Sequence, residues 1–215
     1  MTRHAFETVL LSVSLLAASG ASAADDPAKE TLDKIRDRYE SIDDGEIRFT
    51  QKVKYPMARI EQEVTGTLQF KKEHKYRVEY EGQTIVTDGE TVWSYSRSTN
   101  QVLVDKFQIN ERTLTPERIL GDAPDEYAPT LVGKEKMGKL DMVVLKLTPP
   151  DRKSAVKSMK IWVQEGDWLV RRVEMLDVHG KQTTYQVHSF KTNSGVADSR
   201  FTFQPPDGVE VVDLR

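Results

Sequence analysis

The 215-residue sequence contains no cysteine. The chain therefore has no disulfide, no thiol nucleophile and no cysteine to which a lipid could be attached, so it cannot itself be a bacterial lipoprotein. We expect the fold to depend on its hydrophobic core alone. Once exported, the protein should diffuse freely and not be anchored to a membrane.

Histidine is also scarce, and the motifs of common enzymes are missing. The four histidines are His4, His74, His179 and His188, and no two have the i, i+2 or i, i+4 spacing typical of metal ligands. There is no Gly-x-Ser-x-Gly turn and no phosphate-binding glycine loop. Acids such as Asp88 precede glycine, where they usually serve turns. We expect no enzyme activity, no metal and no cofactor.

An excess of positive charge is likewise absent. The chain has 31 Lys and Arg against 34 Asp and Glu, for a net charge of −3, and both signs are mixed along it. This balance argues against nucleic acid or an anionic membrane surface as the main partner.

One apolar run stands at the N-terminus, and it is too short to span a bilayer. It covers residues 9–18, follows Arg3 and precedes Ala21-Ser22-Ala23, which has the form of a cleavage signal. We interpret residues 1–23 as a signal peptide cleaved after about Ala23. Residues 24–215 then form one domain, which we expect to be periplasmic, soluble and monomeric.

The stretch 66–105 predicts consecutive short strands. Apolar residues alternate with polar ones there, and Gly82, the Asp88-Gly89 pair and residues 98–100 supply turns. Further alternating segments follow as far as residue 212, which gives about ten or eleven strands. Residues 28–41 show helical spacing after Asp26-Pro27, which is typical of a helix start. Residues 115–121 predict a short helix or turn.

A sheet of this width either closes or packs against other elements. One amphipathic helix and a short helical segment are too little to cover both faces. We therefore expect a mainly β, single-domain, unclosed antiparallel β-barrel with the helices across its mouth. The pattern indicates an apolar face, but it leaves open whether the interior is a filled core or a cavity.

Three motifs together resemble one known family. They are Phe-Thr-Gln-Lys-Val at 49–53, Thr-Asp-Gly-Glu-Thr-Val-Trp-Ser-Tyr at 87–95 and Phe-Thr-Phe-Gln-Pro-Pro-Asp-Gly-Val at 201–209. In order and spacing they resemble the LolA-type periplasmic carriers of outer-membrane lipoproteins. The resemblance covers essentially the whole mature chain.

The resemblance implies a hydrophobic cavity under a helical lid, which holds the acyl chains of lipoproteins as cargo. It also implies two protein partners, an inner-membrane ABC transporter that loads the carrier and an outer-membrane receptor lipoprotein that unloads it. A lipid- or lipoprotein-sensing envelope regulator on the same fold is the alternative, and a lipid-hydrolysing enzyme is a weaker third.

The candidate site residues follow from the alternation and the resemblance together. Ile119 and Leu120 are lid candidates. For the acyl-binding candidates, the alternation does not fix which side of each strand faces the interior, so some of them could lie on the opposite face. The residues expected to bind acyl chains are Phe49, Val53, Leu68, Phe70, Tyr76, Val78, Tyr80, Trp93 and Tyr95.

One departure from the family concerns the lid. Well-known members have a Lys-Arg-Pro segment whose arginine bonds to the lid, but this chain has Lys71-Lys72-Glu73. Lysine is a point charge without the planar fork of arginine, so Lys72 is not an equivalent replacement. Two alternatives stay open: Lys72 is the latch and bridges to lid carbonyls, or the latch differs in this chain. Tyr76 matches the family's transporter-contacting aromatic, or it is simply one more sheet aromatic.

Overall fold

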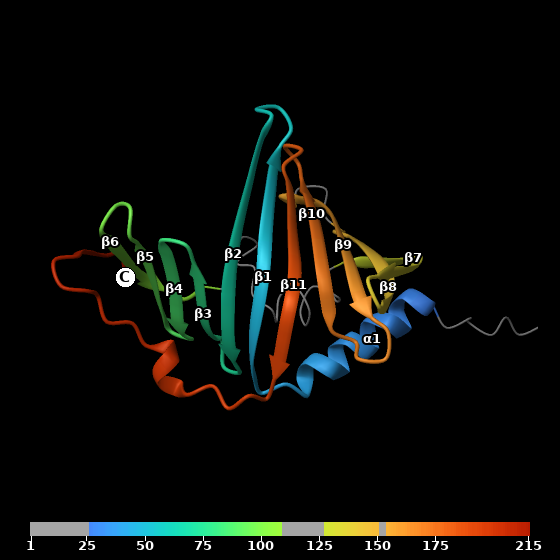
Figure 1. The fold of residues 1–215 in the computed structure, drawn as a ribbon, viewed down its shortest axis with the longest axis horizontal. Coiled ribbons are helices and arrows are strands. Elements are labelled where there is room, and N and C mark those ends of the chain that lie inside the picture. The colour runs from blue at the N-terminus through green and yellow to red at the C-terminus, as the bar shows by residue number, and fades with distance from the viewer. Residues whose placement is uncertain (1–25, 109–126, 151–153) are drawn as a thin grey trace, which may run out of the picture.

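A computed structural model describes residues 26–108, 127–150 and 154–215. Within these residues the framework is one sheet of twelve strands with one α-helix on one of its faces (Figure 1). The helix α1 spans Pro27–Glu40, and a 3-10 helix, η2, spans Asp198–Phe201. The strands are β1 (Asp44–Tyr55), β2 (Ile60–Lys71), β3 (Lys75–Tyr80), β4 (Gln83–Asp88), β5 (Thr91–Ser96), β6 (Gln101–Lys106), β7 (Ala128–Met137), β8 (Leu140–Thr148), β9 (Val156–Gln164), β10 (Val170–Asp177), β11 (Gln182–Thr192) and β12 (Glu210–Asp213).

The order of the strands explains how the sheet is assembled. It runs β12-β6-β5-β4-β3-β2-β1-β11-β10-β9-β8-β7, so two antiparallel meanders meet where β1 pairs with β11. The chain then returns to the opposite edge, and β12 pairs with β6 in the parallel direction (Figure 1). The edge strands β12 and β7 do not pair with each other. The predicted mainly β, unclosed architecture with an N-terminal helix is confirmed.

Helix α1 begins where the sequence predicts. The Asp26 side chain accepts a hydrogen bond from the backbone N–H of Ala28 at 3.0 Å, and Pro27 occupies the first helical position. The apolar stripe of Ala28, Leu32 and Ile35 is buried. It packs against Leu145, Leu147, Met159, Ile161, Val163, Val170 and Val173 of β8, β9 and β10.

We call the side of the sheet that carries α1 the inner face, and the opposite side the outer face. Side chains opposite one another on paired strands share a face, so the register assigns every strand residue to one of the two. Inner-face residues form two contiguous clusters, one under α1 and one over β1–β3. Within the described residues, no helix has the length and apolar character needed to cross a bilayer.

Candidate functional site

The half of the inner face not covered by α1 carries an aromatic cluster. Most of its residues come from β1, β2, β3 and β11, which the antiparallel pairing brings side by side. The others come from α1 and from segments that adjoin α1, β6 and β10. The buried members are Ile42, Ile47, Phe49, Phe70, Tyr76 and Leu169, and the half-buried ones are Tyr39, Leu68, Val78, Tyr80, Phe107, Tyr185, Val187 and Phe190.

Two glycines make room for these rings. A Cβ on Gly66 would lie 3.0 Å from the rings of both Phe49 and Tyr80, and a Cβ on Gly45 would lie 2.8 Å from the ring of Phe70. Both approaches are closer than packed atoms tolerate, so only glycine permits the rings to cross the strand at these points.

The apolar surface continues beyond the buried cluster into an exposed rim. The register places the rim residues on the inner face, because Tyr55 pairs with Ile60 in β1–β2 and Ile85 pairs with Val78 of β3. Their exposed fractions lie between 37 and 50 %, which is high for large apolar side chains. The rim comprises Tyr55, Ile60, Val64, Ile85 and Leu103.

The polar side-chain groups within the aromatic cluster are tyrosine hydroxyls. The Tyr39 hydroxyl accepts a hydrogen bond from the N–H of Val170 at 3.2 Å, and the Tyr185 hydroxyl accepts one from Gln51 Nε2 at 2.7 Å. Burial raises the pKa of Tyr39, Tyr80 and Tyr185 above the ordinary tyrosine value, because the apolar surroundings disfavour a phenolate. The hydroxyls therefore remain neutral at physiological pH.

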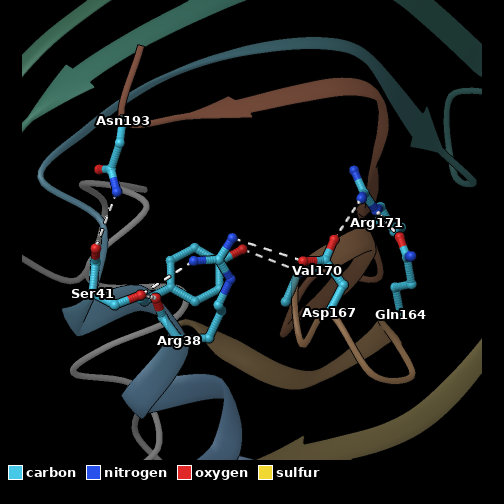
Figure 2. Close-up of polar contacts among 8 residues, drawn as sticks. Arg38, Ser41, Gln164, Asp167, Val170, Arg171 and Asn193 are labelled. Atoms are coloured by element: carbon cyan, nitrogen blue, oxygen red, sulfur yellow. Dashed lines mark hydrogen bonds and ion pairs between the residues drawn. The ribbon is translucent and has the colours of Figure 1, made fainter. Parts of the chain in front are cut away.

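A polar network fixes the C-terminal end of α1 beside the cluster (Figure 2). Asp167 lies 3.0 Å from Arg171 and 3.7 Å from Arg38, so one carboxylate joins the helix to the β9–β10 turn. At the other side, Asn193 donates to the carbonyl of Ser41 at 3.3 Å. These contacts hold the C-terminal end of α1 at the border of the aromatic cluster.

The structure brings together seven of the nine predicted acyl-binding residues. Phe49, Leu68, Phe70, Tyr76, Val78 and Tyr80 lie in the aromatic cluster. Val53 lies on the same face, nearer the tip of the β1–β2 hairpin, where it pairs with Gln62 and Thr183.

Trp93 and Tyr95 lie on the outer face, away from the other candidates. Trp93 pairs with Val86 and Val104, and Tyr95 pairs with Val102; all three valines are buried on that face. The segment after β11 covers them, with Phe203 at 5.9 Å from the Tyr95 ring. These two aromatics therefore belong to a separate core and not to the inner-face site.

The remaining candidates concern the lid. Ile119 and Leu120 lie outside the described residues. Lys72 is exposed, and its Nζ lies 2.5 Å from Asp43 Oδ1 in the α1–β1 connection. Tyr76 packs beside Phe107, with the ring centroids 6.3 Å apart.

Several residues of the site escaped the sequence analysis. Tyr185, Val187 and Phe190 are on β11, and their alternation could have been noticed, but nothing in the sequence shows that β11 pairs with β1. The rim residues Ile60 and Val64 fall in a strand whose other residues are mostly charged or polar, so their exposure was not foreseeable.

A cavity of about 640 Å³ lies elsewhere and has a different character. Lys52, Lys146, Lys160 and Glu174 line it from outer-face positions that follow one another across β1 and β8–β11. Its lining mixes these charged groups with Val132, Met159, Met175 and Leu176, whereas no charged side chain belongs to the aromatic cluster. We therefore place the apolar site at the aromatic cluster. Among the described residues, no three His, Cys, Asp or Glu side chains gather as metal ligands.

Comparison with known proteins bears on this geometry. Residues 40–204 match the family described as "Outer membrane lipoprotein carrier protein LolA". Two similar proteins, both named "Outer-membrane lipoprotein carrier protein", come from Leptothrix cholodnii and Hahella chejuensis. The first is 27% identical over 90% of this chain and 88% of its own length, and the second is 29% identical over 94% and 96%.

A solved structure shows the same fold. An uncharacterized conserved protein from Thermus thermophilus superposes with a TM-score of 0.59 at 16% identity, covering 86% of this chain and 98% of that one. The family match spans well over half of the sequence, and its boundaries enclose every residue of the aromatic cluster except Tyr39 and every strand except β12. The chain belongs to the LolA family of outer-membrane lipoprotein carrier proteins, a family of non-enzymatic transport proteins.

Proposed function

We propose that this protein carries lipoproteins through the periplasm to the outer membrane and that its inner face holds their acyl chains. The observation that carries the proposal is the exposed rim beside the aromatic cluster. Large apolar side chains on a rim that adjoins a buried aromatic cluster are the kind of surface that takes an apolar ligand. Membership of the LolA family supports the same conclusion.

Energetics limits how tightly the cargo is held. Burying one methylene contributes about 0.8 kcal/mol, so a chain of about sixteen carbons gains roughly 12 kcal/mol on leaving water. Three fully buried chains would exceed the roughly 18–21 kcal/mol at which non-covalent affinities saturate. A carrier that releases its cargo must therefore bury the chains incompletely, and a partly exposed rim is suited to this.

The proposal also includes the route. Residues 1–23 direct export and are removed, an inner-membrane ABC transporter loads the carrier, and an outer-membrane receptor lipoprotein unloads it. N-terminal sequencing of the protein purified from the periplasm should find Ala24 or a near neighbour as the first residue. Crosslinking in the native envelope should capture the two partners.

Native mass spectrometry of the protein from its own periplasm tests the function. We expect a bound acylated lipoprotein in the wild type and its loss in Val78→Glu and Ile85→Glu, since a charge on the inner face repels the chains. Val211→Glu is the matched control, because Val211 is exposed and pairs with outer-face Val102. Recovery of phospholipid or fatty acid alone would support a lipid sensor instead, and an equal cargo in all variants would exclude the inner face.

A further inference from the structure

We propose that the hydroxyl of Tyr76 donates a hydrogen bond to an ester carbonyl of the bound cargo, and so selects fatty-acyl esters over other apolar chains. The inference rests on the proposed carrier function. It adds to that function the chemical group that the site recognises.

The first support is an unpartnered polar atom. Tyr76 is 5% exposed, and its Oη atom is buried with no hydrogen-bond partner among the residues that the structure describes. Buried polar groups in folded proteins are almost always paired, because leaving one unpaired is unfavourable. Phenylalanine would fill the same space without this cost, so the hydroxyl calls for a partner beyond the described residues, and the bound cargo can supply one.

The second support is the kind of partner that the surroundings need. The hydroxyls of Tyr39 and Tyr185 each accept a hydrogen bond, and neither donates one to a described residue. The aromatic cluster therefore holds phenolic donors without matching acceptors. A complementary ligand brings an acceptor and no further donor.

An ester carbonyl meets this requirement. It accepts a hydrogen bond and carries no N–H or O–H that would need an acceptor of its own within the apolar cluster. A free carboxylate would bring a charge into an apolar cluster, which is unfavourable without a buried cation. An alkyl chain without a carbonyl would leave the Tyr76 hydroxyl as it is.

The position of Tyr76 fits the head of an acyl chain. Tyr76 pairs with Phe70 on β2 and Thr87 on β4, at the end of β3 where the strand meets the polar turn at residues 72–74. From there the inner face continues along β2 and β3 past Val78 to the exposed rim. A chain whose carbonyl lies at Tyr76 would thus have its hydrocarbon along the apolar surface and its polar head near solvent.

A competition assay on the mature protein tests the proposal. The probes are two synthetic lipopeptides that differ only in having two ester-linked or two ether-linked chains of equal length on the glyceryl group. We expect wild-type protein to prefer the ester by about five- to tenfold, the effect of one neutral hydrogen bond. Tyr76→Phe should bring this ratio to about one while its thermal stability is unchanged or raised.

Controls separate this inference from the carrier function. Tyr95→Phe removes an outer-face hydroxyl and should keep the wild-type ratio. An equal ratio in wild type and Tyr76→Phe would overturn the role of Tyr76 while the carrier function stands. A less stable Tyr76→Phe with an unchanged ratio would likewise overturn it, because the hydroxyl would then have a hydrogen-bond partner within the protein itself. Failure of both probes to bind would reject the carrier function itself.

Discussion

The rings of Phe49 and Tyr80 meet edge to face across Gly66, with their centroids 5.8 Å apart and an angle of 89° between the planes. This is a favourable arrangement for two aromatic rings. It exists because the strand between them has no side chain at the crossing point, where Gly66 pairs with both residues.

Replacing Gly66 by alanine should therefore be costly despite the small change. The new Cβ would lie 2.8 Å from the carbonyl oxygen of Glu79 and 3.0 Å from both rings. Overpacking of this kind costs about 1–3 kcal/mol, and we expect that loss in urea unfolding together with weaker cargo binding. Thr67→Ala, on the other face of β2, is the control. Wild-type stability in Gly66→Ala would contradict the close packing.

Alkaline pH should destabilise the protein through its buried tyrosines. Burial raises the pKa of Tyr39, Tyr80 and Tyr185 in the folded state, so the folded protein holds these protons more tightly than the unfolded chain does. The contribution of these tyrosines to stability is complete below the ordinary tyrosine pKa of about 10 and is lost as the pH rises above it.

Unfolding measured from neutral pH upward checks this expectation, together with the tyrosinate absorbance of the native protein. Tyr39→Phe should show a shallower loss of stability above about pH 10, because one raised pKa is removed. If every tyrosine of the native protein titrated like free tyrosine, the burial of the three hydroxyls would be refuted.

Asp167 should matter for the helix more than its surface position suggests. It pairs with Arg171 and Arg38, and so links the end of α1 to the sheet. Removing both pairs in Asp167→Asn should cost about 1 kcal/mol, at the upper end for partly exposed ion pairs. Hydrogen exchange should also rise over residues 36–42. Asp213→Asn is the matched control, because Arg215 lowers the pKa of Asp213 to about 2 but the pair is exposed at the end of β12 and does not touch α1.

Phe201 should stabilise the outer face without affecting the cargo. It is 1% exposed, and η2 holds it against β3 and β4. Truncating a buried phenylalanine costs about 3–5 kcal/mol, so Phe201→Ala should unfold at clearly lower temperature. At a temperature where the variant is still folded, cargo binding should match wild type. Loss of binding in folded protein would show that the two faces are coupled.

The sequence was sufficient to predict most of the helices and strands. It was not sufficient to assign every strand residue to a face of the sheet. Alternation in β2 and β3 assigned Leu68, Phe70 and Val78 correctly to one side, because polar residues separate them without exception. In β5 the neighbours Val92 and Trp93 are both apolar, so the pattern alone could not decide which side was inner. The register decides it, because Trp93 pairs with the buried Val86 and Val104, and these pairings cannot be read from the alternation within β5 alone.

The seam between β1 and β11 has a consequence for how the chain folds. The hairpins on either side of the seam form between strands that are neighbours in the sequence. The seam itself needs Gly45 of β1 to pair with Thr192 of β11, near the end of the chain. Pairings so distant in sequence are slow to form, and until they form both strands expose open edges that can join other chains. Newly exported protein is therefore most vulnerable to aggregation before β11 has paired with β1. Substitutions that weaken this pairing should lower the yield of folded protein before they lower the activity of the molecules that do fold.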